Sequence, residues 1–168
     1  MLLYFPMALT HGPLTTTPDN RDEKDRGKLF AGMVRYTDKL VGRLVAALEA
    51  NGVRDRTIII FTTDNGTGGM RNRRLGRLVR GGKGRMSEQN GTAMPFIVNC
   101  PGVVPRGVET DALIDFTDML PTFAELGGAA LPEGRVVDGK SFAPLILGRA
   151  KDSPGDGIMS MVGGAAKL

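Results

Sequence analysis

The fold is decided by the stretch TIIIFTTDNG, Thr57 to Gly66, in which a β-branched apolar run ends in an Asp-Asn-Gly turn. Strands buried on both faces read as continuous Ile, Val and Phe runs, so residues 57–63 predict an inner strand of an α/β sheet. Ligands of such sheets lie in the crevice beyond the carboxyl ends of the strands. Asp64 and Asn65 stand at that end and are candidate ligands of a hard cation, although Asn-Gly is also a strong turn signal by itself.

Apolar periodicity on both sides of this strand predicts the neighbouring elements. Residues 2–10 are apolar enough for a buried strand, and residues 30–48 carry an apolar stripe with helical spacing that stops at Asn51-Gly52. The order strand, helix, strand predicts a right-handed βαβ crossover in a parallel sheet. Three further elements are predicted downstream: a strand at residues 95–99 and helices at residues 115–126 and 141–147.

Residues 66–93 are glycine-rich and basic and show no clear period, so they predict one long loop. Within them, residues 71–85 carry seven Arg and Lys side chains and no acidic residue, a charge that attracts anions. No Phe, Tyr or Trp is interleaved to stack on bases. We therefore expect a solvated basic face rather than a nucleic-acid groove, and no nucleic-acid partner.

The composition limits the class of protein. The chain has 168 residues, enough for one domain or part of a larger one, and its 24 glycines imply many tight turns and close backbone approaches. Cys100 is the only cysteine, which excludes an internal disulfide and predicts a small buried hydrophobe. No apolar run approaches the ~20 residues that a bilayer span needs, so we expect no membrane span.

A shared sheet edge would bring four side chains of the chain together. His11, the single histidine, follows the first predicted strand as Asp64 and Asn65 follow theirs, so a parallel sheet would place all three at one edge. The turn Gly81–Gly84 adds the ammonium of Lys83, and its glycines let the backbone approach a ligand. This mixture suits a tetrahedral oxyanion beside a hard cation. A satisfied loop histidine and a solvated surface lysine stay open as alternatives.

Several segments follow one another in a recognisable order. They are Tyr4–Pro13, Thr15–Pro18, Tyr36–Asp38, Val41-Gly42, Thr57–Gly66, Gly82–Gly84, Pro95–Asn99, Pro101-Gly102, Asp118–Thr122 and Asp138–Ser141. This ordered set resembles the sulfatase family of the alkaline phosphatase superfamily. The resemblance implies an α/β fold, part of an alkaline-phosphatase-like sandwich with a mainly parallel central sheet flanked by helices. Residues 1–148 would belong to the catalytic domain and residues 149–168 to the start of a C-terminal region.

The resemblance also assigns roles to the candidate site residues. Asp64 and Asn65 are implied ligands of Ca²⁺, with Mg²⁺ possible, while Lys83 binds the sulfate group and His11 contacts the sulfate or protonates the leaving oxygen. The implied reaction is hydrolysis of a sulfate ester by a formylglycine residue. Formylglycine is made from Cys or Ser in a Cys/Ser-x-Pro-x-Arg motif, which these 168 residues do not contain. We therefore expect a middle piece that lacks the N-terminal half of the same domain and is inactive alone.

Two other functions stay open. One is a non-catalytic remnant that holds sulfated glycans or other polyanions with Lys83 and the basic loop. The other is part of a phosphate or phosphonate ester hydrolase of the same superfamily. Residues 1–9 lack the basic start and cleavage site of a signal peptide, whereas the resemblance implies a periplasmic or extracellular compartment, so the compartment stays unassigned.

Overall fold

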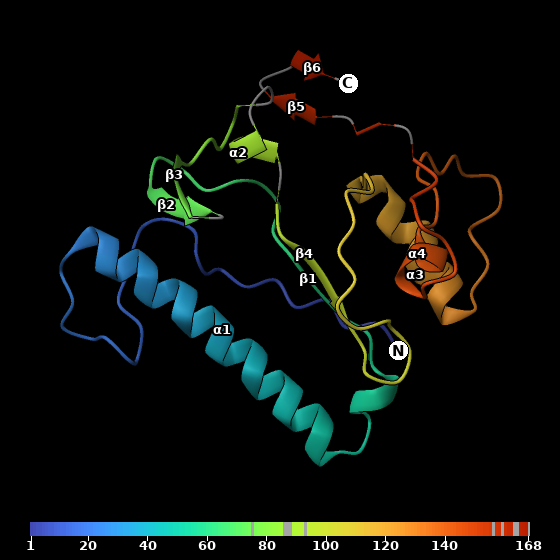
Figure 1. Ribbon diagram of the computed structural model, residues 1–168, viewed down its shortest axis with the longest axis horizontal. Coiled ribbons are helices and arrows are strands. Elements are labelled where there is room, and N and C mark those ends of the chain that lie inside the picture. The colour runs from blue at the N-terminus through green and yellow to red at the C-terminus, as the bar shows by residue number, and fades with distance from the viewer. Residues whose placement is uncertain are drawn as a thin grey trace. The chain divides into compact units, whose positions relative to one another are not determined.

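The computed structural model describes residues 1–74, 76–85, 89–92, 94–155, 157–158, 160–162 and 165–167. The chain divides into two compact units, which we call the helical unit, residues 2–57, and the mixed unit, residues 58–168 together with Met1. Helices and short strands both occur, which confirms a mixed α/β fold (Figure 1). Among the described residues, no helix combines the length and the apolar character that crossing a bilayer requires.

The helical unit is built around the long helix α1 (Arg26–Ala50), which confirms the helix predicted from the apolar stripe (Figure 1). Asp25 begins it, since the Asp25 carboxylate accepts a hydrogen bond of 2.9 Å from the backbone N–H of Lys28. Such a cap satisfies one of the N–H groups that the first turn leaves without a partner. After Asn51 the chain makes one 3₁₀ turn, η1 (Arg54–Arg56), before it enters the mixed unit.

The strand predicted at residues 2–10 is wrong. The structure assigns no strand there, and the side chains of Leu2, Leu3 and Tyr4 are 66%, 70% and 83% exposed. An apolar segment becomes a strand only where a neighbouring strand satisfies its backbone hydrogen bonds, and no described segment pairs with this one. The predicted βαβ crossover is therefore wrong as well.

The mixed unit contains the strand predicted at residues 57–63. β1 (Ile59–Thr62) and β4 (Phe96–Asn99) form a two-stranded antiparallel sheet, which confirms both strands. The expected mainly parallel central sheet is wrong, because each sheet of the described residues is small and antiparallel. An apolar run specifies that a strand is buried, but the connection between two strands decides their relative direction.

The prediction of one long loop at residues 66–93 is also wrong. β2 (Arg71–Arg74) and β3 (Arg77–Arg80) form an antiparallel hairpin, and a short helix α2 (Gln89–Thr92) follows. Gly76, with a φ of 77°, lies between the two strands, where a tight hairpin turn needs positive φ. Arginine occurs on both faces of this hairpin, so no apolar alternation reveals it in the sequence. Near the C-terminus, β5 (Ser160–Val162) pairs with β6 (Ala165–Lys167).

Downstream of β4, the predicted helices are confirmed with small differences at their ends. The first begins as a 3₁₀ turn, η2 (Phe116–Asp118), continues as α3 (Met119–Gly127) and ends at Gly128. The second, α4 (Ala143–Ile146), is shorter than predicted. The assignment of residues 149–168 to a separate C-terminal region stays a prediction; Asp156, Met159, Gly163, Gly164 and Leu168 lie outside the described residues.

A buried polar network ties η2 and α3 to the segment that leads into α4. The carboxylate of Asp118, which is 6% exposed, accepts hydrogen bonds from the backbone N–H groups of Lys140, at 2.8 Å, and Asp115, at 2.9 Å. The hydroxyl of Thr122 donates to the carbonyl of Asp118 at 2.7 Å and accepts from the N–H of Phe142 at 3.0 Å. Two segments that carried the family resemblance are thus bonded to each other.

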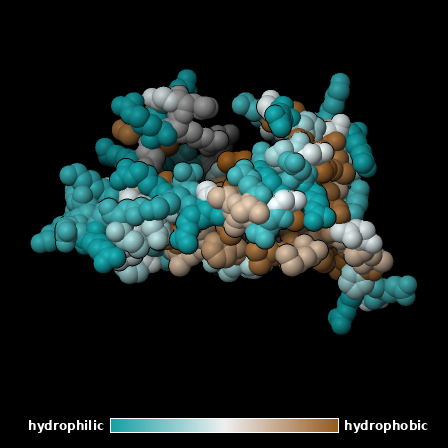
Figure 2. Space-filling model, turned by 90° about the horizontal axis from the view of Figure 1, so that it is seen from below, coloured by the Kyte–Doolittle hydropathy of each residue, from teal (hydrophilic) through white to brown (hydrophobic). Residues whose placement is uncertain are grey.

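The apolar core of the mixed unit surrounds Phe142, which is 0% exposed. Its ring meets that of Phe96 edge to face, with centroids 5.7 Å apart, so β4 and α4 share this core. Cys100 is 1% exposed and not in a disulfide, which confirms the prediction of a small buried hydrophobe. Other apolar side chains reach the surface, such as Ile97 at 58% exposure, and hydrophobic side chains are visible on the face drawn in Figure 2.

Candidate functional site

Asp64 and Asn65 lie just beyond the C-terminal end of β1, separated from it by Thr63. The amide Nδ2 of Asn65 donates a hydrogen bond of 2.6 Å to Oδ2 of Asp64, so the two side chains lie together. Among the described residues, neither Oδ1 of Asp64 nor Oδ1 of Asn65 accepts a hydrogen bond. A carboxylate and an amide oxygen are ligands that hard cations accept, so this donor set fits two of the positions around Ca²⁺ or Mg²⁺.

Three backbone hydrogen bonds join residues 66–70, which follow Asn65, to residues 81–91, which include Lys83. They run from Gly66 N–H to Gly91 C=O, at 3.0 Å, from Lys83 N–H to Thr67 C=O, at 3.0 Å, and from Gly81 N–H to Met70 C=O, at 2.8 Å. We call this set of contacts the glycine joint. It places the backbone of Lys83 beside that of Thr67, which follows Asn65 by two positions.

Glycine is required in the joint because the backbones touch. A Cβ atom built on Gly66 would overlap the carbonyl of Asn90, and one built on Gly81 would overlap the carbonyls of Gly68 and Thr67. Only a residue without a side chain lets two chains approach so closely. In the described residues, Gly81 and Gly82 lie against other backbone of the same chain, and the approach of a ligand to this turn stays a prediction.

Lys83 occupies a tight turn and is exposed. The turn is closed by a hydrogen bond of 2.8 Å from Arg85 N–H to Gly82 C=O, and Gly84 within it has a φ of 82°. No ion pair of the Lys83 ammonium occurs among the described residues. An exposed ammonium that forms no ion pair with the described residues is available to bind an anion.

His11 lies in the other unit. Its Nδ1 is 2.7 Å from the carbonyl oxygen of Gly12, and because a carbonyl only accepts, Nδ1 carries a proton in this arrangement. Asp64, Asn65 and Lys83 belong to the mixed unit, whereas His11 belongs to the helical unit. The parallel sheet that was expected to bring His11 to their edge is wrong, so a meeting of His11 with these residues stays a prediction.

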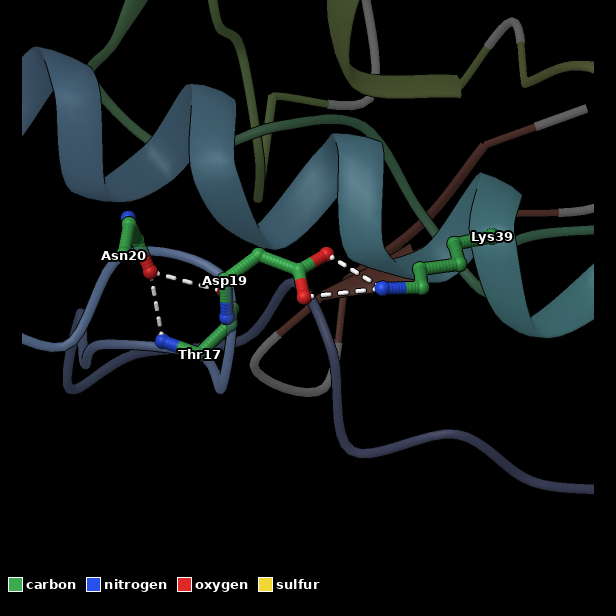
Figure 3. A network of polar contacts seen from close by, with 4 residues as sticks. All are labelled: Thr17, Asp19, Asn20 and Lys39. Carbon is green, nitrogen blue, oxygen red and sulfur yellow. Dashed lines mark hydrogen bonds and ion pairs between the residues drawn. The ribbon is translucent and has the colours of Figure 1, made fainter.

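The loop that follows His11 is anchored to the long helix by a polar network (Figure 3). Oδ1 of Asn20 accepts hydrogen bonds from the backbone N–H of Thr17, at 2.6 Å, and from its hydroxyl, at 2.7 Å. Lys39 on α1 bonds both carboxylate oxygens of Asp19, at 2.8 and 2.9 Å. The side-chain amide of Asn20 also fits against α1 at Gly32, where a Cβ would overlap it. This loop has a structural role.

A complete metal centre is not found among the described residues, since no three His, Cys, Asp or Glu side chains cluster there. Asp64 and Asn65 are thus a pair of donors and not a full coordination shell, which for Ca²⁺ has roughly six to eight oxygen ligands. The sequence did not show the backbone partners next to this pair: Gly91 C=O accepts from Gly66 N–H, and Thr67 C=O accepts from Lys83 N–H. The recurrence of glycine at positions 66, 81, 82, 84 and 91 was the available signal.

A model of one protein family matches most of the chain. The family is described as Sulfatase, and the match covers residues 4–129. Human arylsulfatase D is 34% identical to the chain over 154 residues, covering 88% of this chain and 26% of arylsulfatase D. Human arylsulfatase A is 37% identical over 151 residues, covering 89% of this chain and 29% of arylsulfatase A.

A solved structure shows that the likeness extends to the fold. The crystal structure described as that of Ps i-CgsB superposes with a TM-score of 0.74 at 30% identity, covering 94% of this chain and 36% of that one. The chain therefore spans between a quarter and two fifths of the length of these similar proteins.

Proposed function

Because this chain belongs to the sulfatase family, we propose that it supplies part of a site that hydrolyses sulfuric esters. The observation that supports the proposal is the glycine joint, because it bonds the backbone of Lys83 to that of Thr67, two positions after Asn65, whose amide is bonded to Asp64. A cation and an ammonium held near each other are what a sulfate group with several oxygens requires.

Each residue has a distinct task in this proposal. Asp64 and Asn65 would hold Ca²⁺, or Mg²⁺, through side-chain oxygens, and a cation held there would supply electrostatic stabilisation to a sulfate oxygen. Lys83 donates hydrogen bonds from its ammonium to another sulfate oxygen and neutralises charge that develops there. His11 contacts the sulfate or, as a general acid, gives a proton to the leaving alcohol oxygen.

The metal-ligand pair can be tested without any turnover. We expect Mn²⁺, a hard paramagnetic cation, to broaden the amide NMR signals of Asp64 and Asn65 first, and then those of Thr67, Lys83 and Gly91 across the glycine joint. The double variant Asp64→Ala, Asn65→Ala should lose this pattern. Asp111→Ala, which removes another exposed carboxylate of the same unit, is the matched control and should keep it.

The anion site needs a second titration. Inorganic sulfate should shift the signals of Gly82 to Gly84 in the parent chain and not in Lys83→Gln, with chloride of equal ionic strength as the reference. Broadening by Mn²⁺ that survives the double variant, or sulfate shifts that survive Lys83→Gln, would contradict the proposed roles.

A non-catalytic role is the alternative, favoured by the absence of any Cys/Ser-x-Pro-x-Arg motif from the 168 residues. In that case Lys83 and the basic residues around it bind polyanions and the metal is irrelevant. Binding of a sulfated polymer that is unchanged when EDTA removes divalent cations, together with no Mn²⁺ pattern at Asp64, would favour this role.

A further inference from the structure

The hairpin β2–β3 presents an arginine face. The ladder places Arg71 opposite Arg80 and Arg73 opposite Leu78. Directly opposed residues of an antiparallel pair lie on the same face, as do residues two apart on one strand. Arg71, Arg73, Arg80 and Leu78 therefore share one face, which we call the arginine face, and all four are exposed.

The arginine face is unfavourable for the hairpin by itself. Like charges directly opposite each other in a sheet destabilise it, and Arg71 and Arg80 are such a pair. No Asp or Glu occurs between Asn65 and Ser87 to compensate, and none of the three arginines makes an ion pair with a described residue. A ligand with several negative groups would remove this repulsion, because each guanidinium can bond two oxygens of one anionic group.

The face is also continuous in the chain with the proposed anion site. The hydrogen bond from Gly81 N–H to Met70 C=O, which belongs to the glycine joint, lies next to the last pair of the hairpin, Arg71 and Arg80. Lys83 follows Arg80 by three positions. Three residues of chain span at most about 11 Å. One ligand of several sugar units can therefore reach both Lys83 and the arginine face.

We propose that the arginine face binds additional sulfate groups of a polysulfated glycan, whose reacting sulfate is held at Lys83. This rests on the proposed function, since it makes the face a second subsite of that same site. A sulfated glycan fits better than a nucleic acid, because residues 65–92 contain no Phe, Tyr or Trp on which bases stack.

The test compares two double variants with equal loss of charge. Arg71→Gln with Arg80→Gln alters the arginine face, while Arg77→Gln with Arg106→Gln removes two exposed arginines outside it. Dextran sulfate is the probe, unsulfated dextran the control, and binding is followed by fluorescence anisotropy in EDTA across a salt series. We expect the first double variant to bind about tenfold more weakly and the second to change less than about threefold.

Several results would overturn the proposal. The parent chain could fail to bind dextran sulfate at low salt, or both double variants could bind it equally weakly. The parent chain could also bind a single-stranded DNA oligonucleotide as tightly as dextran sulfate, with the same dependence on Arg71 and Arg80. These results differ from those that would contradict the proposed function. If the proposed function is wrong, inorganic sulfate does not shift the NMR signals of Gly82 to Gly84 through Lys83. The first double variant should leave that effect intact.

Discussion

The buried carboxylate of Asp118 bonds two segments that lie far apart in the sequence, residues 115–122 and residues 138–142. Asp118 accepts the backbone N–H groups of Lys140 and Asp115, and Gly139 packs so closely that a Cβ there would overlap the carbonyl of Thr117. The sequence marked both segments as family motifs but did not show that they touch. Their separation along the chain hides a contact that only the fold creates.

Removing this carboxylate should destabilise the mixed unit. We expect Asp118→Ala to lower the free energy of unfolding by about 1–3 kcal/mol, because two partly buried N–H donors lose their acceptor. Asp118→Asn should also destabilise, since it turns an NH₂ group toward one of those donors. Urea unfolding followed by circular dichroism measures the change, and faster hydrogen exchange at the Lys140 amide reports it if the transition is broad.

The control for this prediction is another Asp to Ala change. Asp111 is exposed, so Asp111→Ala should stay within about 0.5 kcal/mol of the parent chain. Equal stability of the Asp118→Ala and Asp111→Ala variants would show that the Asp118 network contributes nothing.

At the scale of elements, prediction succeeded where the pattern was local. The apolar stripe within α1 and the β-branched run of β1 were sufficient to identify a helix and a strand. The direction of pairing was not predictable, because β1 and β4 are joined by a connection long enough for either arrangement. The hairpin β2–β3 was missed because arginine, which is polar on both faces, leaves no alternation to detect.

The base of the hairpin offers a prediction at this scale. Gly81→Ala should force the backbones of the glycine joint apart, at a cost of about 1–3 kcal/mol, because the new methyl group would overlap the carbonyl of Gly68. Gly69→Ala is the matched control, since a Cβ at Gly69 meets no other atom within 4 Å. Amide hydrogen exchange at Lys83 should accelerate in Gly81→Ala and remain unchanged in Gly69→Ala; equal rates in the two variants would refute the role of the joint.

For the whole molecule, the order of motifs identified the family although the predicted sheet was wrong. The ordered motifs extend over the helical and mixed units, and the family match spans residues 4–129. The roles of the candidate site residues stay predictions, and the structure adds a backbone hydrogen bond between Thr67 and Lys83. The place of His11 depended on the sheet direction, which is why it could not be derived from the sequence.

The activity of the whole chain is expected to be nil. A sulfatase site whose attacking group is missing loses most of its rate, because the groups of such a site act as a unit. With no Cys/Ser-x-Pro-x-Arg motif in the 168 residues, purified protein should not release the phenol of an aryl sulfate above the rate of buffer with Ca²⁺. Turnover that disappears in Lys83→Ala would contradict this expectation.

The glycine joint also limits how this chain can change over evolutionary time. Gly66, Gly81 and Gly91 lie so close to other backbone that a side chain at any of them would overlap a carbonyl group. A substitution at these positions therefore cannot change the site without moving the backbone. Arg71, Arg77 and Arg80 beside them are exposed, so we expect other side chains to be accommodated there. A lineage of such proteins would therefore acquire new substrate preferences through the hairpin while the geometry around Lys83 stays constant.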